Sequence, residues 1–269
     1  MTDARFQQAL ALHRGRKLED AERLYREILA EEPRHFDALH LVGLVQYETG
    51  RWDAAVASMR AAIAVRPGFA PAFANLGLAL QKLQHLDEAL ASYDRALELA
   101  PDYAEGHYNR GNVLLDLKRL EDAVASFDRA LALEAGRAPA LYNRGIALLD
   151  LERPEEAIAS FDRALALKPE YAQALYNRAI ALQHLRRQDE VAASLARLLE
   201  LVPDFPFAPG MLLHAQMHCC DWSKFAPAVD AINQGVDLND LLSALLEGYR
   251  DLMLLSVPGD LSSLLFRSQ

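Results

Sequence analysis

The stretch that decides the fold is residues 104–137, AEGHYNRGNVLLDLKRLEDAVASFDRALALEAGR. Similar blocks flank it on both sides. Residues 70–103 are APAFANLGLALQKLQHLDEALASYDRALELAPDY, and residues 138–171 are APALYNRGIALLDLERPEEAIASFDRALALKPEY. Self-similarity at a fixed spacing of about 34 residues is typical of repeat proteins, in which each unit packs on its neighbours. The sequence therefore predicts a repeat architecture with no single central core.

Prolines mark the repeat boundaries. They recur at one position of the register, Pro33, Pro67, Pro101, Pro169 and Pro203, and Ala135 stands in the one remaining place. Because proline cannot continue a helix and restricts the residue before it, each is expected to follow the end of a helical hairpin. Residues 70–103 contain two segments with helical spacing of core residues, first Phe73, Leu76, Gly77 and Leu80, then Ala89, Tyr93 and Ala96.

A small residue recurs in the middle of the first segment of each repeat, at Gly43, Gly77, Gly111, Gly145 and Ala179. Glycine inside a helix costs about 1 kcal/mol relative to alanine. Since that cost is repeated, we expect a packing reason for it, namely a second helix that crosses closely at this point.

These features resemble the tetratricopeptide repeat. In residues 104–137 the signature positions of that repeat fall on His107, Arg110, Gly111, Leu114, Ala123, Phe127, Ala130 and Ala135. Arg110 and Ala135 depart from it, because the family has leucine and proline there. The resemblance implies an all-α, right-handed superhelix of antiparallel helical hairpins.

The register divides the chain into six such hairpins, at residues 2–35, 36–69, 70–103, 104–137, 138–171 and 172–205. Residues 206–235 are expected to form a degenerate seventh hairpin, with Val229 and Ile232 facing inward. Residues 236–269 are expected to hold a capping helix and a tail. In the capping helix, Leu241, Leu242, Leu245 and Leu246 would make the apolar stripe. This last segment does not resemble the continuation of related proteins, so an altered reading frame is an alternative.

Composition excludes several classes of function. The 269 residues carry a formal net charge of -10, which argues against a nucleic-acid binder and against an anionic membrane surface. The two cysteines, Cys219 and Cys220, are adjacent and form no disulfide framework. With no secretory signal and no apolar run long enough for a membrane span, the cytoplasm is the expected location. The apolar tail suggests a homodimer as a further alternative.

Four consecutive repeats have asparagine at one position of the first helix, Asn75, Asn109, Asn143 and Asn177. In tetratricopeptide proteins this helix lines the concave face, so the resemblance implies a ladder of amides along a groove. Amides both donate and accept hydrogen bonds, which suits the capture of an extended peptide backbone. The alternative is that each asparagine ties one repeat to the next.

Other residues are expected to complete the groove. Tyr108, Tyr142 and Tyr176 precede the asparagines and would contact side chains of a ligand, or else pack against the neighbouring hairpin. Leu115, Leu149 and Ile146 would form an apolar floor.

Three arginines replace the leucine of the repeat pattern. Arg110, Arg144 and Arg178 each follow an aspartate by the same interval, and those aspartates are Asp94, Asp128 and Asp162. We expect ion pairs between successive repeats, with a structural role.

No catalytic constellation is evident. His214 and His218 have the i, i+4 spacing of metal ligands on one helix face, but two ligands are too few, and a packed helix is the favoured interpretation. The sequence contains no phosphate-binding loop and no nucleophile motif, and no cofactor is expected. Acidic pairs such as Glu155-Glu156 are expected to complement the helix dipole.

A second resemblance extends beyond the repeats. Residues 204–225, DFPFAPGMLLHAQMHCCDWSKF, resemble the junction in SPINDLY-type O-linked N-acetylglucosamine transferases, where a repeat arm leads through a Cys-Asp-Trp turn into the glycosyltransferase. Only 34 residues follow Gly235, so no catalytic residue is carried over. The sequence predicts a non-enzymatic protein-interaction module that binds an extended peptide or partner segment in its concave groove. The alternative is the substrate-recruiting arm, or a truncated relative, of such a transferase.

Overall fold

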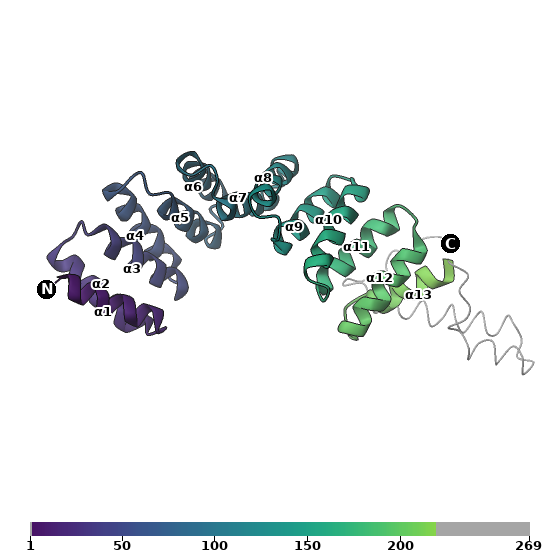
Figure 1. The fold of residues 1–269 in the computed structure, drawn as a ribbon, viewed down its shortest axis with the longest axis horizontal. Helices are drawn as coiled ribbons and strands as arrows, with labels where there is room; N and C mark the ends of the chain where they lie inside the picture. The colour runs from purple at the N-terminus through teal and green to yellow at the C-terminus, as the bar shows by residue number, and fades with distance from the viewer. Residues whose placement is uncertain (1, 219–269) are drawn as a thin grey trace, which may run out of the picture. The chain divides into compact units, whose positions relative to one another are not determined.

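The computed structural model describes residues 2–218, which form thirteen α-helices and no strand (Figure 1). The helices are α1 (Thr2–Arg14), α2 (Leu18–Glu31), α3 (Phe36–Glu48), α4 (Trp52–Val65), α5 (Ala70–Lys82), α6 (Leu86–Leu99), α7 (Ala104–Asp116), α8 (Leu120–Leu133), α9 (Ala138–Asp150), α10 (Pro154–Leu167), α11 (Ala172–His184), α12 (Gln188–Leu201) and α13 (Ala208–His218). The all-α fold class predicted from the sequence is confirmed.

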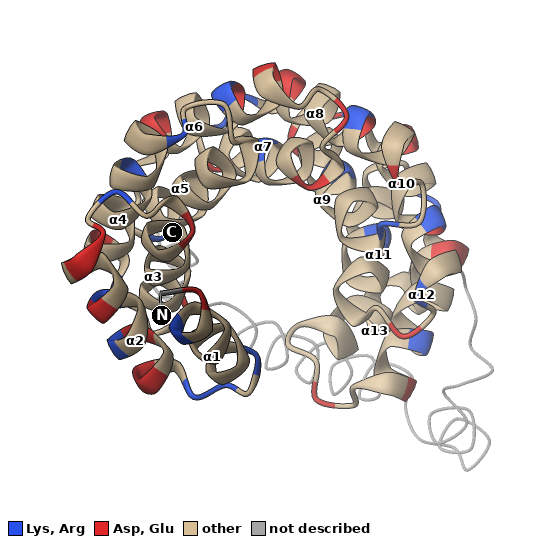
Figure 2. Ribbon diagram, turned by 60° about the vertical axis from the view of Figure 1, so that its left-hand side comes forward, with Lys and Arg blue, Asp and Glu red and all other residues tan. Residues whose placement is uncertain are grey.

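The chain forms two compact units, one ending at Ala147 and the other beginning at Leu148, within the last turn of α9. In the first unit, helices that follow one another in the chain pack as antiparallel neighbours from α1 to α8. Here α3, α5 and α7 lie along the inner side of the array and α4, α6 and α8 along the outer side (Figure 2). In the second unit α11 packs on both α10 and α12, and α12 packs on α13.

A left-handed residue ends the first helix of every hairpin. The backbone φ is positive at Arg16, Gly50, Gln84, Lys118, Glu152 and Arg186, which share one position of the register. A tight hydrogen bond from the following residue closes each turn; for example, the N–H of His85 donates to the carbonyl of Leu80 at 3.0 Å. This is the Schellman arrangement, which satisfies carbonyls that the end of a helix leaves without partners.

The turn between hairpins has the same backbone with or without proline. Before Pro101, Ala100 has φ -140° and ψ 82°, and before Ala135, Glu134 has φ -137° and ψ 84°. Both residues lie outside the helical region, which a following proline disfavours. Alanine in place of proline at position 135 therefore leaves the backbone of the turn between hairpins unchanged.

The core of each hairpin is built where a large side chain meets the small residue of the first helix. A Cβ added at Gly111 would lie 2.6 Å from Cε1 of Phe127, and one added at Gly77 would lie 2.8 Å from Cζ of Tyr93. Real Cβ atoms do not approach other atoms so closely. The expected close crossing of the second helix is thus confirmed at these positions.

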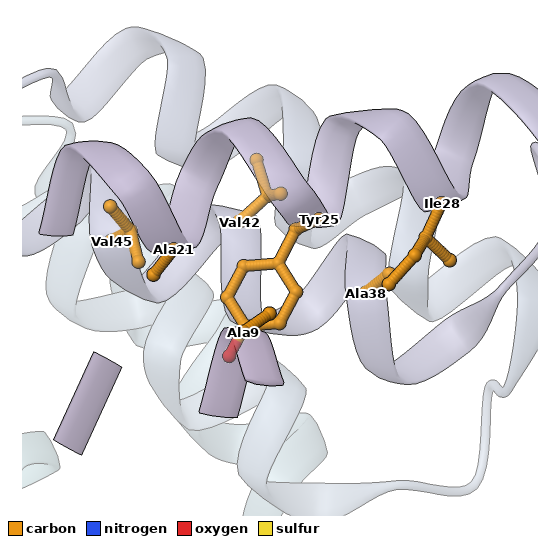
Figure 3. Packing of buried hydrophobic residues seen from close by; sticks show 7 residues of the cluster. All are labelled: Ala9, Ala21, Tyr25, Ile28, Ala38, Val42 and Val45. Carbon is orange, nitrogen blue, oxygen red and sulfur yellow. The ribbon is translucent and has the colours of Figure 1, made fainter. Parts of the chain in front are cut away.

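The first three helices enclose a similar cluster at the start of the chain. Tyr25 from α2 is fully buried among Ala9 of α1 and Ala38, Val42 and Val45 of α3, with Ala21 and Ile28 on its own helix (Figure 3). Helices too short to be stable alone gain most of their stability from such packing.

A buried carboxylate joins three helices beside this cluster. Glu22 of α2 is only 8% exposed at its side chain and accepts hydrogen bonds from both terminal nitrogens of Arg51, which immediately precedes α4. Arg26 adds a second ion pair at 2.8 Å. Burial raises the pKa of Glu22, but the Arg51 hydrogen bonds, the charges of Arg26 and Arg51 and a hydrogen bond from Gln46 outweigh burial and lower the pKa overall.

The expected ion pairs between successive repeats are present. Nε of Arg110 lies 2.6 Å from Asp94, Nε of Arg144 lies 2.6 Å from Asp128, and Nε of Arg178 lies 2.5 Å from Asp162. Each arginine lies on the first helix of one hairpin and contacts an aspartate on the second helix of the preceding hairpin. This prediction is therefore confirmed. The aspartates are about half exposed, so each pair adds only modest stability.

Several expectations concern residues outside the described part of the chain. They are the second helix of the seventh hairpin, the Cys220-Asp221-Trp222 turn, the capping helix and the tail. Among residues 2–218, no helix combines the length and apolar character needed to cross a bilayer.

Candidate functional site

The expected site residues occupy one register of the first helices. Asn75 lies on α5, Asn109 on α7 and Asn143 on α9, all in the first unit, and Asn177 lies on α11 in the second. Since α5 and α7 lie along the inner side of the first unit, Asn75 and Asn109 belong to the helices of that face (Figure 2).

Two members of the asparagine ladder are bonded to the preceding repeat. The Nδ2 atom of Asn75 lies 2.9 Å from Nε2 of His40, and Nδ2 of Asn143 donates to Oδ1 of Asn112 at 2.7 Å. Asn143 also lies 3.5 Å from the Tyr108 hydroxyl, at the limit of a hydrogen bond. At these two positions the asparagine ties one repeat to the next, which is the structural alternative considered from the sequence.

Asn109 differs from its neighbours in the ladder. His40 and Tyr108 each stand 35 residues before the asparagine that they contact, and the residue 35 before Asn109 is Ala74, which has no polar side chain. Asn109 is 7% exposed, and it makes no hydrogen bond through its side chain to any other residue in the described part of the chain. Its amide atoms are not among the fully buried polar atoms that lack a partner, so the small exposed part of Asn109 includes the amide group.

The tyrosines that precede the asparagines pack on the end of their own repeat. The guanidinium of Arg137 lies 5.1 Å from the ring centre of Tyr108, and the ring of Phe205 lies 5.0 Å from that of Tyr176. Both tyrosines are half-buried, and so is Tyr142. Tyr108 and Tyr176 therefore have a packing role, and all three tyrosines keep part of their surface accessible.

The expected floor residues are all half-buried. Leu115 and Ile146 belong to the first unit and Leu149 to the second. The helices of the inner face carry few basic groups, and α5 has only Lys82. The exposed carboxylate of Asp116, at the end of α7, accepts a 3.2 Å hydrogen bond from Gln81. This face is thus mainly neutral, with an acidic rim.

His40 and Asn112 were not predicted from the sequence. Burial lowers the pKa of His40, with Asp37 opposing, so the ring that contacts Asn75 is neutral near pH 7. The His40 contact and the Tyr108 contact both span 35 residues, one more than the repeat, and this spacing is a signal that could have found them. Asn112 stands 31 residues before Asn143 and does not follow this spacing.

Two equivalent hollows lie between the second helices. One, of about 560 Å³, is lined by Asp94, Arg110 and Ser126, and the other, of about 410 Å³, by Asp162, Arg178 and Ser194. In both, the arginine donates to the serine hydroxyl as well as to the aspartate. Because the charged side chains that line them are paired with each other, we interpret these hollows as part of the contact between successive repeats.

The helix that carries the histidine pair packs on its neighbour as expected, since α13 contacts α12. His214 is half-buried and His218 is exposed, and their Nε2 atoms lie 3.2 Å apart. Burial, and then the charge of His218, lower the pKa of His214. Among residues 2–218, no group of three or more potential metal ligands gathers.

The comparisons with known proteins agree with the repeat geometry. Tetratricopeptide repeat family models match residues 6–70, 75–139 and 138–171. Together these ranges span more than half of the chain, which therefore belongs to the tetratricopeptide repeat family. No curated protein sequence matches it.

Solved structures share the fold at low sequence identity. One is that of pilF from Pseudomonas aeruginosa, with 20% identity and a TM-score of 0.66, covering 81% of this chain and 97% of that one. Another is YrrB, described as a TPR protein with an unusual peptide-binding site, with 19% identity and a TM-score of 0.62, covering 72% and 97%. MamA matches with 21% identity and a TM-score of 0.58, covering 61% and 96%. At such identities the likeness establishes the fold alone.

Proposed function

We propose that this protein is a non-catalytic interaction module that holds an extended peptide segment on the inner face of its repeats. The observation that carries the proposal is Asn109, whose amide group reaches solvent and has no hydrogen-bond partner among the described residues. The repeat fold supports it in a general way, since such proteins present an extended concave surface to partners.

Asn109 has the groups needed to bind one peptide unit. Its carbonyl accepts from a backbone N–H, and its NH₂ group donates to a backbone C=O. Because the amide reaches solvent and has no protein partner among the described residues, both of its groups are available to a peptide. Asn75 and Asn143 are less suited, since their NH₂ groups are engaged with His40 and Asn112.

The surroundings of Asn109 define the chemistry of the peptide. Tyr108 offers part of its surface and Leu115 an apolar side chain, so the peptide would carry apolar or aromatic side chains on one side. Asp116 at the rim disfavours an acidic segment. We therefore propose a neutral or basic extended peptide as the ligand. A partner of this kind also fits the net charge of -10 and a cytoplasmic setting.

The test is a selection of peptides from a displayed random library on the full chain. The affinities of the selected peptides are then measured by calorimetry for the wild type and Asn109→Ala. Loss of two hydrogen bonds is expected to weaken binding by about tenfold or more. Arg129→Ala, an exposed change on the outer helix α8, is the matched control and should bind as the wild type does.

Three results would contradict the proposal. One is the selection of no peptide. The second is equal affinity for Asn109→Ala and the wild type, which would move recognition away from the inner face. The third is a set of selected peptides that is predominantly acidic.

A second proposal rests on the sequence after α13. The Cys220-Asp221-Trp222 motif that follows the repeats resembles the junction of SPINDLY-type transferases, so the chain would serve as the substrate-recruiting arm of such an enzyme. Co-expression with a transferase catalytic region, followed by assay of sugar transfer to a selected peptide, tests it. Transfer that is the same without this chain would contradict it.

A further inference from the structure

We propose that Asn112 makes a second contact with the backbone of the bound peptide, and that Asn143 positions it so that its NH₂ group is left for the ligand. This inference rests on the proposed function. It adds which residue makes the second contact and which peptide atom that residue recognises, a backbone carbonyl oxygen. Asn112 lies on α7 and Asn143 on α9, and both belong to the first unit.

The bond between the two asparagines fixes the orientation of the Asn112 amide. Nδ2 of Asn143 donates to Oδ1 of Asn112 at 2.7 Å. A side-chain amide has one acceptor oxygen and one NH₂ group, so this contact engages the oxygen end of Asn112. The Asn112 amide cannot turn over without bringing its NH₂ group against that of Asn143. The NH₂ end of Asn112 is therefore the end that remains for another partner.

That NH₂ group is accessible in the free protein. Asn112 is half-buried, and its side chain makes no second hydrogen bond to any residue within 2–218. The fully buried polar atoms that lack a partner do not include its Nδ2, so this nitrogen reaches solvent. Asn112 can thus donate a hydrogen bond to a ligand while it still accepts the one from Asn143.

An amide at this position is unusual among the repeats of the chain. The equivalent residues of the other five repeats are all aliphatic, namely Leu10, Leu44, Leu78, Ile146 and Ile180. Packing of the first helix therefore does not require an amide here. The repeat that contains Asn112 is also the one in which Asn109 has no protein partner among the described residues.

The spacing of Asn109 and Asn112 matches an extended peptide. Residues three apart on a helix lie on one face, with Cβ atoms about 5–6 Å apart. In an extended chain the backbone groups return to the same edge at every second residue, a distance of about 6.5 Å. Rotation of the side chains covers the small difference. Asn109 then binds the N–H and C=O of one peptide residue, and Asn112 donates to the C=O of a residue two positions away.

Asn112→Asp separates binding from the structural tie between repeats. Aspartate keeps an oxygen that accepts from Asn143, but a second acceptor replaces the NH₂ group and repels a peptide carbonyl. The probe is a neutral peptide selected from a displayed random library on the full chain. Calorimetry is expected to show its affinity weakened by about tenfold or more in Asn112→Asp. Gln8→Glu, which adds the same charge at an exposed amide of α1, is the matched control and should bind as the wild type does.

Asn143→Asp tests the positioning role. Aspartate at position 143 cannot donate, so the Asn112 amide turns and gives its NH₂ group to the new carboxylate. The tie between the repeats is kept, and the donor that the peptide needs is lost. The affinity for the same peptide should fall about as far as in Asn112→Asp. Urea denaturation of both variants checks that they are folded.

The outcomes separate this inference from the proposed function. Weaker binding in Asn109→Ala with unchanged binding in Asn112→Asp would overturn this inference and leave the proposed function standing. Weaker binding in Asn112→Asp with unchanged binding in Asn143→Asp would overturn the positioning role of Asn143. Unchanged affinity in all three folded variants, or selection of no peptide, would overturn the inference and the proposed function together.

Discussion

The aromatic rings that fill the centres of four hairpins show how single atoms affect stability. Tyr25, Tyr93, Phe127 and Phe161 occupy the same register and are all fully buried, but the hydroxyls of Tyr25 and Tyr93 have no hydrogen-bond partner among the described residues. Burial raises the pKa of Tyr25 to about 12 and that of Tyr93 further still. These two phenols are therefore neutral, and each carries the cost of a lost hydrogen bond to water.

Tyr93→Phe is expected to stabilise the protein. Removing an unsatisfied buried hydroxyl recovers part of its desolvation cost, so the free energy of unfolding should rise by about 1 kcal/mol in urea denaturation. The reverse change in the neighbouring repeat, Phe127→Tyr, should lower it. A loss of stability in Tyr93→Phe would show that the hydroxyl has a partner in solution.

The glycine in the middle of the first helix allows the same substitution to be compared in two repeats. Gly111→Ala places a Cβ 2.6 Å from the rigid ring of Phe127, whereas Gly43→Ala places one 2.8 Å from the flexible end of Met59. The first change should cost about 1–3 kcal/mol by overpacking, although alanine favours the helix. The second should cost much less because methionine adapts to its surroundings. Chemical denaturation of both variants checks this, and equal losses would contradict it.

Glu22 links stability to pH. Its pKa is lowered in the folded state, so its contribution is fully present above the ordinary value of 4.5 and is lost as the pH falls through the folded pKa. Glu22→Gln should cost about 1–3 kcal/mol at pH 7, and the difference from wild type should shrink below about pH 4.5. Glu31→Gln, which removes an exposed partner of Arg5, is the control and should have little effect. Urea denaturation across this pH range measures both, and a constant difference would contradict the assignment.

At the scale of the element, the turns between hairpins differ in one residue but share one backbone. Ala135 occupies the position of Pro101 and Pro169, and Glu134 before it has the same backbone conformation as the residues before those prolines. Ala135→Pro should therefore stabilise the protein by about 0.4–1 kcal/mol, because it restricts only the unfolded chain. Thermal denaturation measures the gain, and Pro101→Ala should show the opposite change. A destabilised Ala135→Pro would show that this turn relaxes in solution.

The all-α fold could be predicted because the same signals recur in most of the repeats. Proline marks the ends of hairpins, and the mid-helix glycines mark the close crossings that were found at Phe127 and Tyr93. The left-handed residue that ends each first helix could not be predicted in the same way. Gly50 alone has the residue type that this conformation favours, while Gln84 and Lys118 adopt it because the Schellman turn requires it.

At the scale of the whole molecule, the sequence predicts that the asparagines share one position of the repeat. It does not predict which of them have hydrogen-bond partners. A single column of the repeat alignment contains Asn75, Asn109 and Asn143, so the sequence groups them. Whether each amide has a partner depends on another column, in the preceding repeat, where His40 and Tyr108 offer polar atoms and Ala74 does not. Only the structure shows which residues of the two columns contact each other.

This distinction separates a binding role from a structural one. Asn143→Ala should lower the free energy of unfolding, because it removes the bond to Asn112. Asn109→Ala should leave stability unchanged, because it removes an amide with no protein partner among the described residues.

The most direct test of the central claim is the affinity of a library-selected peptide for Asn109→Ala relative to wild type, with the stability of both proteins measured in the same buffer. The account predicts binding weakened by about tenfold or more in a variant that is no less stable. Unchanged affinity in a stably folded variant would contradict the assignment of Asn109 as the backbone contact.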